Sequence, residues 1–186
     1  MTFTIPNFLT LLRMGLVPLF IITVVNGDSR KALLVFVAAG VTDALDGSIA
    51  RIWGQQSLLG AYLDPIADKL LLTSAYVVLS FPSLNHGAQI PLWVTILVIA
   101  RDVLIVIMAL VLYLAAGVRK FPPTLLSKVN TALQVATVVL VLISNALPDL
   151  RFVELTAVTA IYLVAILTVA SGLDYIVRRI RQMEKV

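Results

Sequence analysis

Long apolar runs alternate with short polar joints along this sequence. The runs cover about residues 8–27, 31–52, 58–81, 91–117, 124–147 and 152–177, and Gly, Pro, Asn, Asp or basic residues separate them. A helix that crosses the hydrocarbon core of a bilayer needs roughly 20 mostly apolar residues, which is about the length of each run. The pattern therefore predicts an all-α integral membrane protein with six transmembrane helices. No joint is long enough for a further domain, so we expect one domain over residues 1–186.

The first residues, MTFTIPNFLTLLR, predict a short interfacial segment before the first helix. Phe3, Ile5 and Phe8 are apolar, and Pro6 stands at the entrance to the helix. Arg13 lies inside the first apolar run and no basic stretch precedes it, which is not the pattern of a cleaved signal peptide. We therefore expect the first helix to be retained.

Composition supports a membrane protein and restricts the chemistry. Of the 186 residues, 60% are hydrophobic and 13% are charged, whereas soluble domains have about 25% charged residues. The sequence has no cysteine and a single histidine, His86. A disulfide framework and a thiolate metal site are therefore excluded. His86 lies in a joint on the side away from the acidic residues described below, so we expect it to be solvated.

The basic residues of the joints predict the orientation in the membrane. One side carries the larger set, Arg51, Arg119, Lys120, Arg178, Arg179, Arg181 and Lys185. The other side carries Arg30, Lys31 and Arg151. Because the side richer in Lys and Arg is cytoplasmic, both termini are expected in the cytoplasm. This topology and anionic lipids explain the net charge of +4 without a nucleic-acid partner.

Four aspartates lie close together in residues 42–70, TDALDGSIARIWGQQSLLGAYLDPIADKL. Asp43 and Asp46 share one face near the end of the second helix, and Asp64 and Asp68 share one face of the third. A short joint makes these helices antiparallel, so the two faces meet on the cytoplasmic side. Four carboxylates at membrane depth cannot all stay ionised without cations. The pattern predicts a divalent metal site with oxygen ligands, suited to Mg²⁺, Mn²⁺ or Ca²⁺ and large enough for two ions.

Small residues accompany the aspartates. Gly47, Ala50 and Gly60 leave space for a ligand near the backbone, although small residues are also common where membrane helices pack. Beside four acids and Arg51, a binding site is the favoured interpretation. Mg²⁺ bridges carboxylates to phosphates, and a guanidinium binds phosphate as a fork. The residues therefore indicate a membrane phosphotransferase, with one acid as the base for an attacking hydroxyl.

Eight residues of this stretch follow one spacing, Asp43-x2-Asp46-Gly47-x2-Ala50-Arg51-x8-Gly60-x3-Asp64-x3-Asp68. This spacing resembles, without departure, the signature of the CDP-alcohol phosphotransferases, which are integral membrane enzymes of phospholipid synthesis. The resemblance continues in IPNFLTLLR, IARDVLIV and SKVNTALQ, and so extends over most of the chain.

The resemblance implies a six-helix homodimer with a polar cavity open to the cytoplasmic leaflet. It assigns two Mg²⁺ or Mn²⁺ ions to Asp43, Asp46 and Asp64, and it makes Asp68 the base for the acceptor hydroxyl as well as a further metal ligand. The ions would hold the diphosphate of CDP-diacylglycerol, and CMP would leave. Contacts to this CDP-lipid are implied for Gly47, Ala50, Arg51, Gly60, Asn7 and Thr10.

The resemblance places the acceptor near Arg101, Lys128 and Asn130. The sequences Arg101-Asp102 and SKVNT resemble the CMP-forming cardiolipin synthases of the family, which use phosphatidylglycerol. The branch that uses glycerol 3-phosphate has basic residues in place of Ala109 and Asn130. Phosphatidylglycerol is therefore the favoured acceptor and glycerol 3-phosphate the alternative. Arg101 has a second interpretation, a pair with Asp102, and Lys128 a second one, extension to the interface.

Two other classes of membrane protein also place carboxylates in the bilayer. A transporter or ion-binding protein would be expected to have discontinuous helices in repeated halves, and no repeat is visible in the sequence. Intramembrane prenyltransferases carry their acidic motifs on helices that are far apart in the sequence. The favoured interpretation is a phosphatidyltransferase in a bacterial inner membrane, with the active site on the cytoplasmic side.

Overall fold

The computed structural model describes residues 5–53, 58–85, 87–116 and 124–183, and this part of the chain contains helices and no strand. Some side chains lie outside the described structure, namely those of residues 5–9, 44–53, 58–65, 109, 112–113, 115–116 and 179–183. The helices are α1 (Ile5–Val25), α2 (Ser29–Trp53), α3 (Leu58–Val78), the 3-10 helix η1 (Pro82–Leu84), α4 (Leu92–Ala116), α5 (Leu125–Ala146) and α6 (Arg151–Met183). The six α-helices follow the six apolar runs, which confirms the predicted number and order of helices within the described residues.

The amino terminus differs from the prediction. Ile5 to Arg13 belong to α1, which continues without a break to Val25. Pro6 stands in the first turn, where its missing N–H costs no helical hydrogen bond. The predicted interfacial segment is therefore not a separate element in the described chain.

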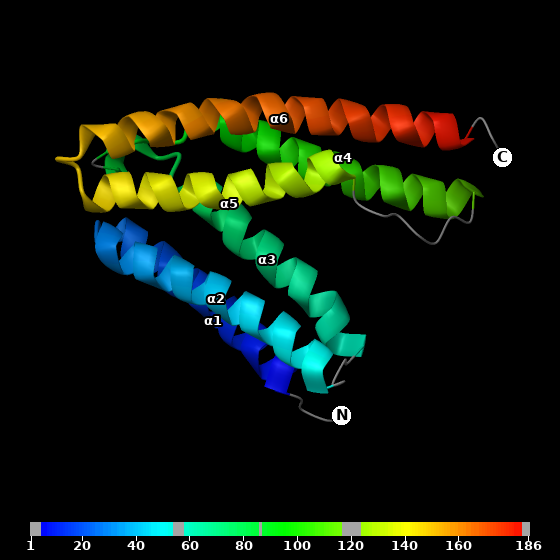
Figure 1. Cartoon of the computed structure of the whole chain (residues 1–186), viewed down its shortest axis with the longest axis horizontal. Helices are drawn as coiled ribbons and strands as arrows, with labels where there is room; N and C mark the ends of the chain where they lie inside the picture. The colour runs from blue at the N-terminus through cyan, green and yellow to red at the C-terminus, as the bar shows by residue number, and fades with distance from the viewer. Residues whose placement is uncertain (1–4, 54–57, 86, 117–123, 184–186) are drawn as a thin grey trace.

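Two helical hairpins form most of the molecule (Figure 1). Helix α1 packs along α2, and α5 packs along α6; α3 lies against α1, α4 against α6, and α2 against α5. The hairpins lie together at the end where α5 turns into α6 and diverge toward the other end. Phe20 and Phe36 pack between α1 and α2 with ring centroids 5.7 Å apart. Burial of such side chains is worth about 1.5–3 kcal/mol each in water.

Polar contacts hold the joint between α3 and α4 onto the end of α5. The Asn145 amide accepts a hydrogen bond from the N–H of Gly87 (2.9 Å) and donates to the carbonyl of Ala88 (2.9 Å). The Ser144 hydroxyl accepts from the N–H of Ala88 (3.0 Å). A Cβ on Gly87 would stand 2.6 Å from the Ser144 carbonyl oxygen, so this close approach requires glycine.

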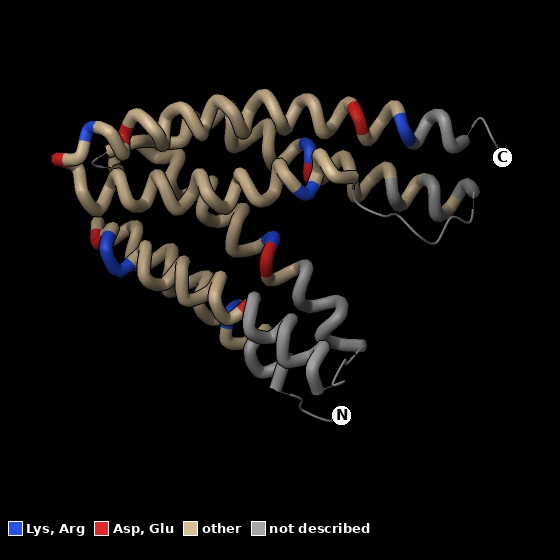
Figure 2. The backbone as a smooth tube through the Cα atoms, in the orientation of Figure 1, with Lys and Arg blue, Asp and Glu red and all other residues tan. Residues whose placement is uncertain are grey.

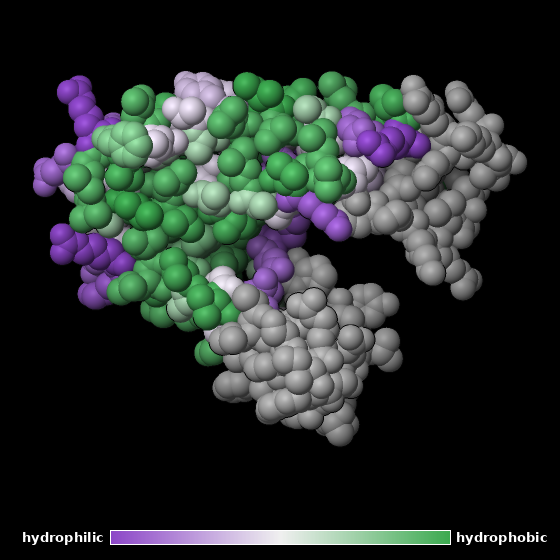
Figure 3. All heavy atoms as spheres, viewed as in Figure 1, coloured by the Kyte–Doolittle hydropathy of each residue, from purple (hydrophilic) through white to green (hydrophobic). Residues whose placement is uncertain are grey.

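Large hydrophobic side chains cover much of the outer surface (Figure 3). Leu114, Leu125 and Phe152 are 73%, 81% and 77% exposed. Soluble monomers rarely expose apolar patches of more than a few hundred Å². By length and composition, two described helical stretches can cross a membrane, Leu125–Ala146 and Arg151–Arg178, while Thr10–Val25 is apolar but shorter.

Charged residues of the described chain lie mainly at two levels along the helices (Figure 2). One level is the end with the α1–α2 and α5–α6 joints, where Asp28, Arg30 and Arg151 are found. The other crosses the bundle where the hairpins diverge. The helical segments between the two levels are uncharged, and the buried charged residues of the described chain, Arg13 and Arg101, are at the second level.

Candidate functional site

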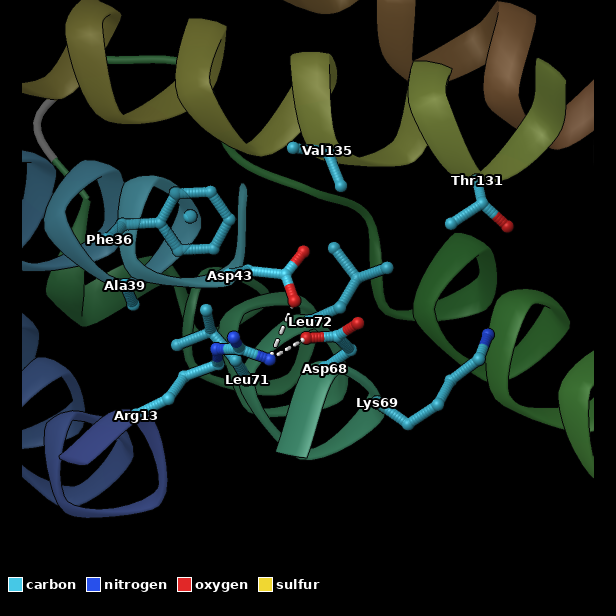
Figure 4. A pocket seen from close by; sticks show the side chains of 11 residues that line it. Arg13, Phe36, Ala39, Asp43, Asp68, Lys69, Leu71, Leu72, Thr131 and Val135 are labelled. Carbon is cyan, nitrogen blue, oxygen red and sulfur yellow. Dashed lines mark hydrogen bonds and ion pairs between the residues drawn. The ribbon is translucent and has the colours of Figure 1, made fainter. Parts of the chain in front are cut away.

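A cavity of about 270 Å³ lies between α1, α2, α3 and α5 at the second charged level. Its polar residues are Arg13, Asp43, Asp68, Lys69 and Thr131. The rest of the lining consists of small or apolar residues, Phe36, Ala39, Gly40, Leu71, Leu72 and Val135. Figure 4 shows the carboxylates of Asp43 and Asp68 side by side in the cavity lining, with the Arg13 guanidinium next to both. The cavity thus combines an anionic wall with apolar surroundings.

Arg13 holds the two carboxylates together. One guanidinium nitrogen, Nη1, lies 2.8 Å from Asp43 Oδ1 and 2.5 Å from Asp68 Oδ1. The Arg13 side chain is fully buried, whereas those of Asp43 and Asp68 are 44% and 48% exposed. Arg13 therefore contacts the aspartates from the protein side and leaves both carboxylates accessible from the cavity.

The described carboxylates have the donor chemistry of an Mg²⁺ or Mn²⁺ site. Asp43 and Asp68 supply hard oxygen ligands from two different helices, which is the ligand type these ions prefer. The described residues contain no group of three or more potential metal ligands. Asp46 and Asp64, the other two predicted ligands, are in α2 and α3, but their side chains lie outside the described residues. The metal role of all four stays a prediction.

The residues predicted to bind the CDP-lipid are mostly outside the described side chains. This applies to Asn7, Gly47, Ala50, Arg51 and Gly60, although α1, α2 and α3 contain them. Thr10 is described; it is fully buried in α1 and does not line the cavity. His86 also lies outside the described residues.

Arg101, a predicted acceptor contact, is buried in a polar network between helices. Its Nε donates to Ser171 Oγ on α6 (3.2 Å), Nη1 to Asp102 Oδ1 (2.9 Å), and Nη2 to Ser127 Oγ on α5 (2.6 Å). The side chain is 6% exposed. The second carboxylate oxygen of Asp102 accepts from the ammonium of Lys69 on α3. The alternative interpretation of Arg101 as a partner of Asp102 is therefore confirmed, and the network adds two serines and Lys69.

The other two predicted acceptor residues lie in different surroundings. Lys128 is exposed and lines a groove with Ser127, Thr131, Ala132 and Val135. Thr131 and Val135 also line the cavity, so this groove adjoins it.

Asn130 is fully buried and accepts a hydrogen bond from the Thr168 hydroxyl on α6 (3.2 Å). It lines neither the cavity nor the groove. The structure thus brings Lys128 next to the cavity and places Asn130 in the contact between α5 and α6.

Comparison with known proteins shows the family of this chain. The profile of the CDP-alcohol phosphatidyltransferase family matches residues 3–171, which is most of the chain. The protein belongs to the CDP-alcohol phosphatidyltransferase family. The match includes the cavity, the network around Arg101 and the whole aspartate stretch.

Family members with three different names are similar to this chain. A human CMP-forming cardiolipin synthase is 36% identical over 191 residues, which cover 92% of this chain and 60% of the human protein. A CDP-diacylglycerol–glycerol-3-phosphate 3-phosphatidyltransferase of Haemophilus influenzae is 35% identical, with 95% and 93% covered. A probable phosphatidylglycerophosphate synthase of Mycobacterium tuberculosis (strain H37Rv) is 31% identical, with 95% and 82% covered. The chain spans 53–60% of the human, rat and fly cardiolipin synthases that it matches.

Sequence analysis of this family member missed two residues of the polar level. Arg13 served as an argument against a signal peptide and as the last residue of IPNFLTLLR, and Asp102 as the neighbour of Arg101 in the family resemblance, but neither was assigned to the site. A signal was present for Arg13, because an arginine inside an apolar run must find an acidic partner in the bundle. The sequence did not indicate which aspartates it would contact.

Proposed function

We propose that the protein transfers the phosphatidyl group of CDP-diacylglycerol to an alcohol acceptor and releases CMP. The observation that carries this proposal is the position of Asp43 and Asp68, two aspartates of the family signature, side by side in the lining of one cavity. Family membership supplies the class of reaction. The protein is then a phosphatidyltransferase of phospholipid synthesis.

The same proposal includes insertion in a membrane through all six helices. Its support is the apolar outer surface, the two described stretches of spanning length, and the uncharged segments between two charged levels. From Lys31 to Asp43 the rise along α2 is about 18 Å, which is less than the roughly 30 Å of a hydrocarbon core. The cavity would therefore lie inside the cytoplasmic half of the bilayer. We place both termini in the cytoplasm and assign the protein to a bacterial inner membrane as a homodimer.

Divalent metal belongs to this proposal. Asp43 and Asp68, with Asp46 and Asp64, would hold two Mg²⁺ or Mn²⁺ ions, which would neutralise the diphosphate and the leaving phosphate of CMP. Asp68 accepts the proton of the acceptor hydroxyl. The acceptor oxygen forms a bond to the phosphatidyl phosphorus, and the bond from that phosphorus to the oxygen of the CMP phosphate breaks.

Phosphatidylglycerol is the acceptor that we favour. Arg101 is committed to Asp102, Ser127 and Ser171, which leaves Lys128 as the exposed cation among the described residues that line the groove beside the cavity. A single lysine suits the phosphodiester of phosphatidylglycerol, which carries one charge, better than the dianionic phosphate of glycerol 3-phosphate.

Glycerol 3-phosphate is the second candidate acceptor, for a specific reason. The Haemophilus enzyme, named for this acceptor, matches over 93% of its own length, whereas 60% of the human cardiolipin synthase is covered. Sequence identity does not separate the two, because the values are 35% and 36%.

The experiment is a reconstituted assay with CDP-diacylglycerol and Mg²⁺ or Mn²⁺. Phosphatidylglycerol and glycerol 3-phosphate are offered separately, and CMP and the lipid product are followed. CMP together with cardiolipin is the expected result. CMP together with phosphatidylglycerophosphate would reverse the choice of acceptor, and an absence of CMP with both acceptors would overturn the proposed activity. Activity that survives exhaustive chelation would overturn the metal requirement.

A further inference from the structure

The position of Arg13 gives it more than a packing role. Its guanidinium is fully buried on α1, and one nitrogen contacts Asp43 from α2 and Asp68 from α3. The same two carboxylates are almost half exposed toward the cavity. A permanent positive charge therefore lies directly behind carboxylates that are open to a ligand on their other side.

This positive charge opposes a metal ion at the same carboxylates. Arginine stays protonated in proteins, so its charge cannot be removed when a cation approaches. Like charges within several ångströms in a partly buried site repel one another strongly. A divalent ion bound to Asp43 and Asp68 would lie close to Arg13. The guanidinium already offsets part of the negative charge with which the two aspartates attract the ion.

The substrate carries charge of the opposite sign. The diphosphate of a CDP-lipid is an anion, and its arrival adds negative charge to a site that holds Arg13 and divalent metal. The diphosphate offers the guanidinium a second anionic partner, so its arrival lessens the hold of Arg13 on Asp43 and Asp68 and makes both carboxylates more available to the ion. Because binding free energies are linked, a nucleotide that favours metal binding is itself bound more tightly when metal is present.

We propose that Arg13 is an internal counter-cation of the aspartate pair. In the absence of metal it neutralises Asp43 and Asp68, and it makes tight metal binding depend on the nucleoside diphosphate. Arg13 is a positioning residue, because it acts on the substrate through the aspartates. The inference rests on the proposed metal-dependent function. It adds to that function that metal and CDP-lipid are bound tightly only when both are present.

A purely structural role of Arg13 predicts the opposite change in metal affinity. If Arg13 only fixes the two carboxylates, its removal disorders metal ligands, and loss of such supporting contacts typically weakens metal binding 10- to 100-fold. If Arg13 is a counter-cation, removal of its charge strengthens metal binding. The direction of the change therefore distinguishes the two roles.

The test is a titration of the purified full-length protein with Mn²⁺, in which free Mn²⁺ is measured by electron paramagnetic resonance. Arg13→Gln removes the charge, and Arg13→Met is a second neutral variant in case the glutamine variant does not fold. Arg13→Lys is the matched control, because it retains the charge. Each protein is titrated with and without CDP.

We expect the neutral variants to bind Mn²⁺ about tenfold more tightly than the wild type in the absence of CDP. Addition of CDP should strengthen Mn²⁺ binding less in these variants than in the wild type. The lysine variant should stay within about threefold of the wild type. A melting temperature that is lower without metal, and a larger rise on addition of Mn²⁺, should accompany the change in the neutral variants.

Unchanged or weaker Mn²⁺ binding in the folded neutral variants would overturn the inference. An equal effect of CDP in the wild type and the neutral variants would also overturn it. Failure of the wild type and the neutral variants to bind Mn²⁺ even with CDP has a different meaning, because it would overturn the proposed metal centre itself. The titration thus separates failure of the inference from failure of the proposed function.

Discussion

Replacement of Arg101 by methionine tests whether this arginine ties helices together or contacts the acceptor. The change removes three hydrogen bonds, to Ser127 on α5, Ser171 on α6 and the neighbouring Asp102. Asp102 keeps the ammonium of Lys69 as a partner, so no carboxylate is left without a counter-charge. Methionine has an apolar chain of similar length that can occupy the space beside α6.

The expected loss of stability follows from these contacts. A hydrogen bond to a charged group contributes about 1.5–3 kcal/mol, and bonds within one network are not additive. Removal of a buried guanidinium also recovers part of its desolvation cost. We expect the free energy of unfolding to fall by about 3 kcal/mol. The matched control, Ser171→Ala, removes one of the three bonds and should lower it by about 1 kcal/mol.

The assay combines equilibrium unfolding in mixed micelles with steady-state kinetics at a temperature where the variant is folded. If Arg101 links helices and does not contact the acceptor, we expect this loss of stability together with an acceptor KM that changes less than threefold. An unfolding free energy within 0.5 kcal/mol of the wild type, with an acceptor KM raised tenfold or more, would refute this reasoning. Arg101 would then be the acceptor contact that the sequence predicted.

Three further substitutions test other parts of the molecule. Asp68→Asn should abolish transfer and leave the protein folded and metal-bound, as measured by CMP release and Mn²⁺ titration; full activity would remove its role as the base. Lys128→Gln should raise the KM of the acceptor about tenfold, the effect of one lost charged contact, without a change in unfolding free energy, and an unchanged KM would exclude the groove as the acceptor site. Asn145→Ala should lower the unfolding free energy by about 2–4 kcal/mol, because buried backbone groups in the α3–α4 joint lose their hydrogen bonds, and kcat should not change. The exposed Thr159→Ala is its control. An equal effect of both substitutions would contradict the role of Asn145 in holding this joint onto α5.

The helices were predictable because the pattern that specifies them is local. An apolar run of bilayer length in a chain that cannot leave backbone groups unpaired in lipid has to be helical. This requirement gave the number and order of the described helices. The predicted separation of the amino-terminal segment from the first helix is absent in residues 5–13, because proline fits the first turn of a helix.

The candidate site was predictable only where its residues share one helix or one helical hairpin. Regular spacing gave Asp43 and Asp68, because residues three and four apart lie on one face and antiparallel neighbours bring such faces together. Arg13 approaches Asp68 from 55 positions away along the chain, and Ser171 reaches Arg101 from 70 positions away. These partners depend on how the hairpins pack, and no periodicity in the sequence encodes that.

The two buried arginines divide the second charged level of the described structure into two parts. Arg13 links α1 to α2 and α3, while Arg101 links α4 to α5 and α6. Among the described ion pairs, the contact of Lys69 with Asp102 joins the two parts. Apolar packing of α2 on α5 also joins the two parts, toward the other end of the bundle. The cavity lies where these halves meet, so a change in any charge at this level alters the relation between helices together with the chemistry. Stability and kinetics therefore have to be measured on the same variant before a role in catalysis is assigned.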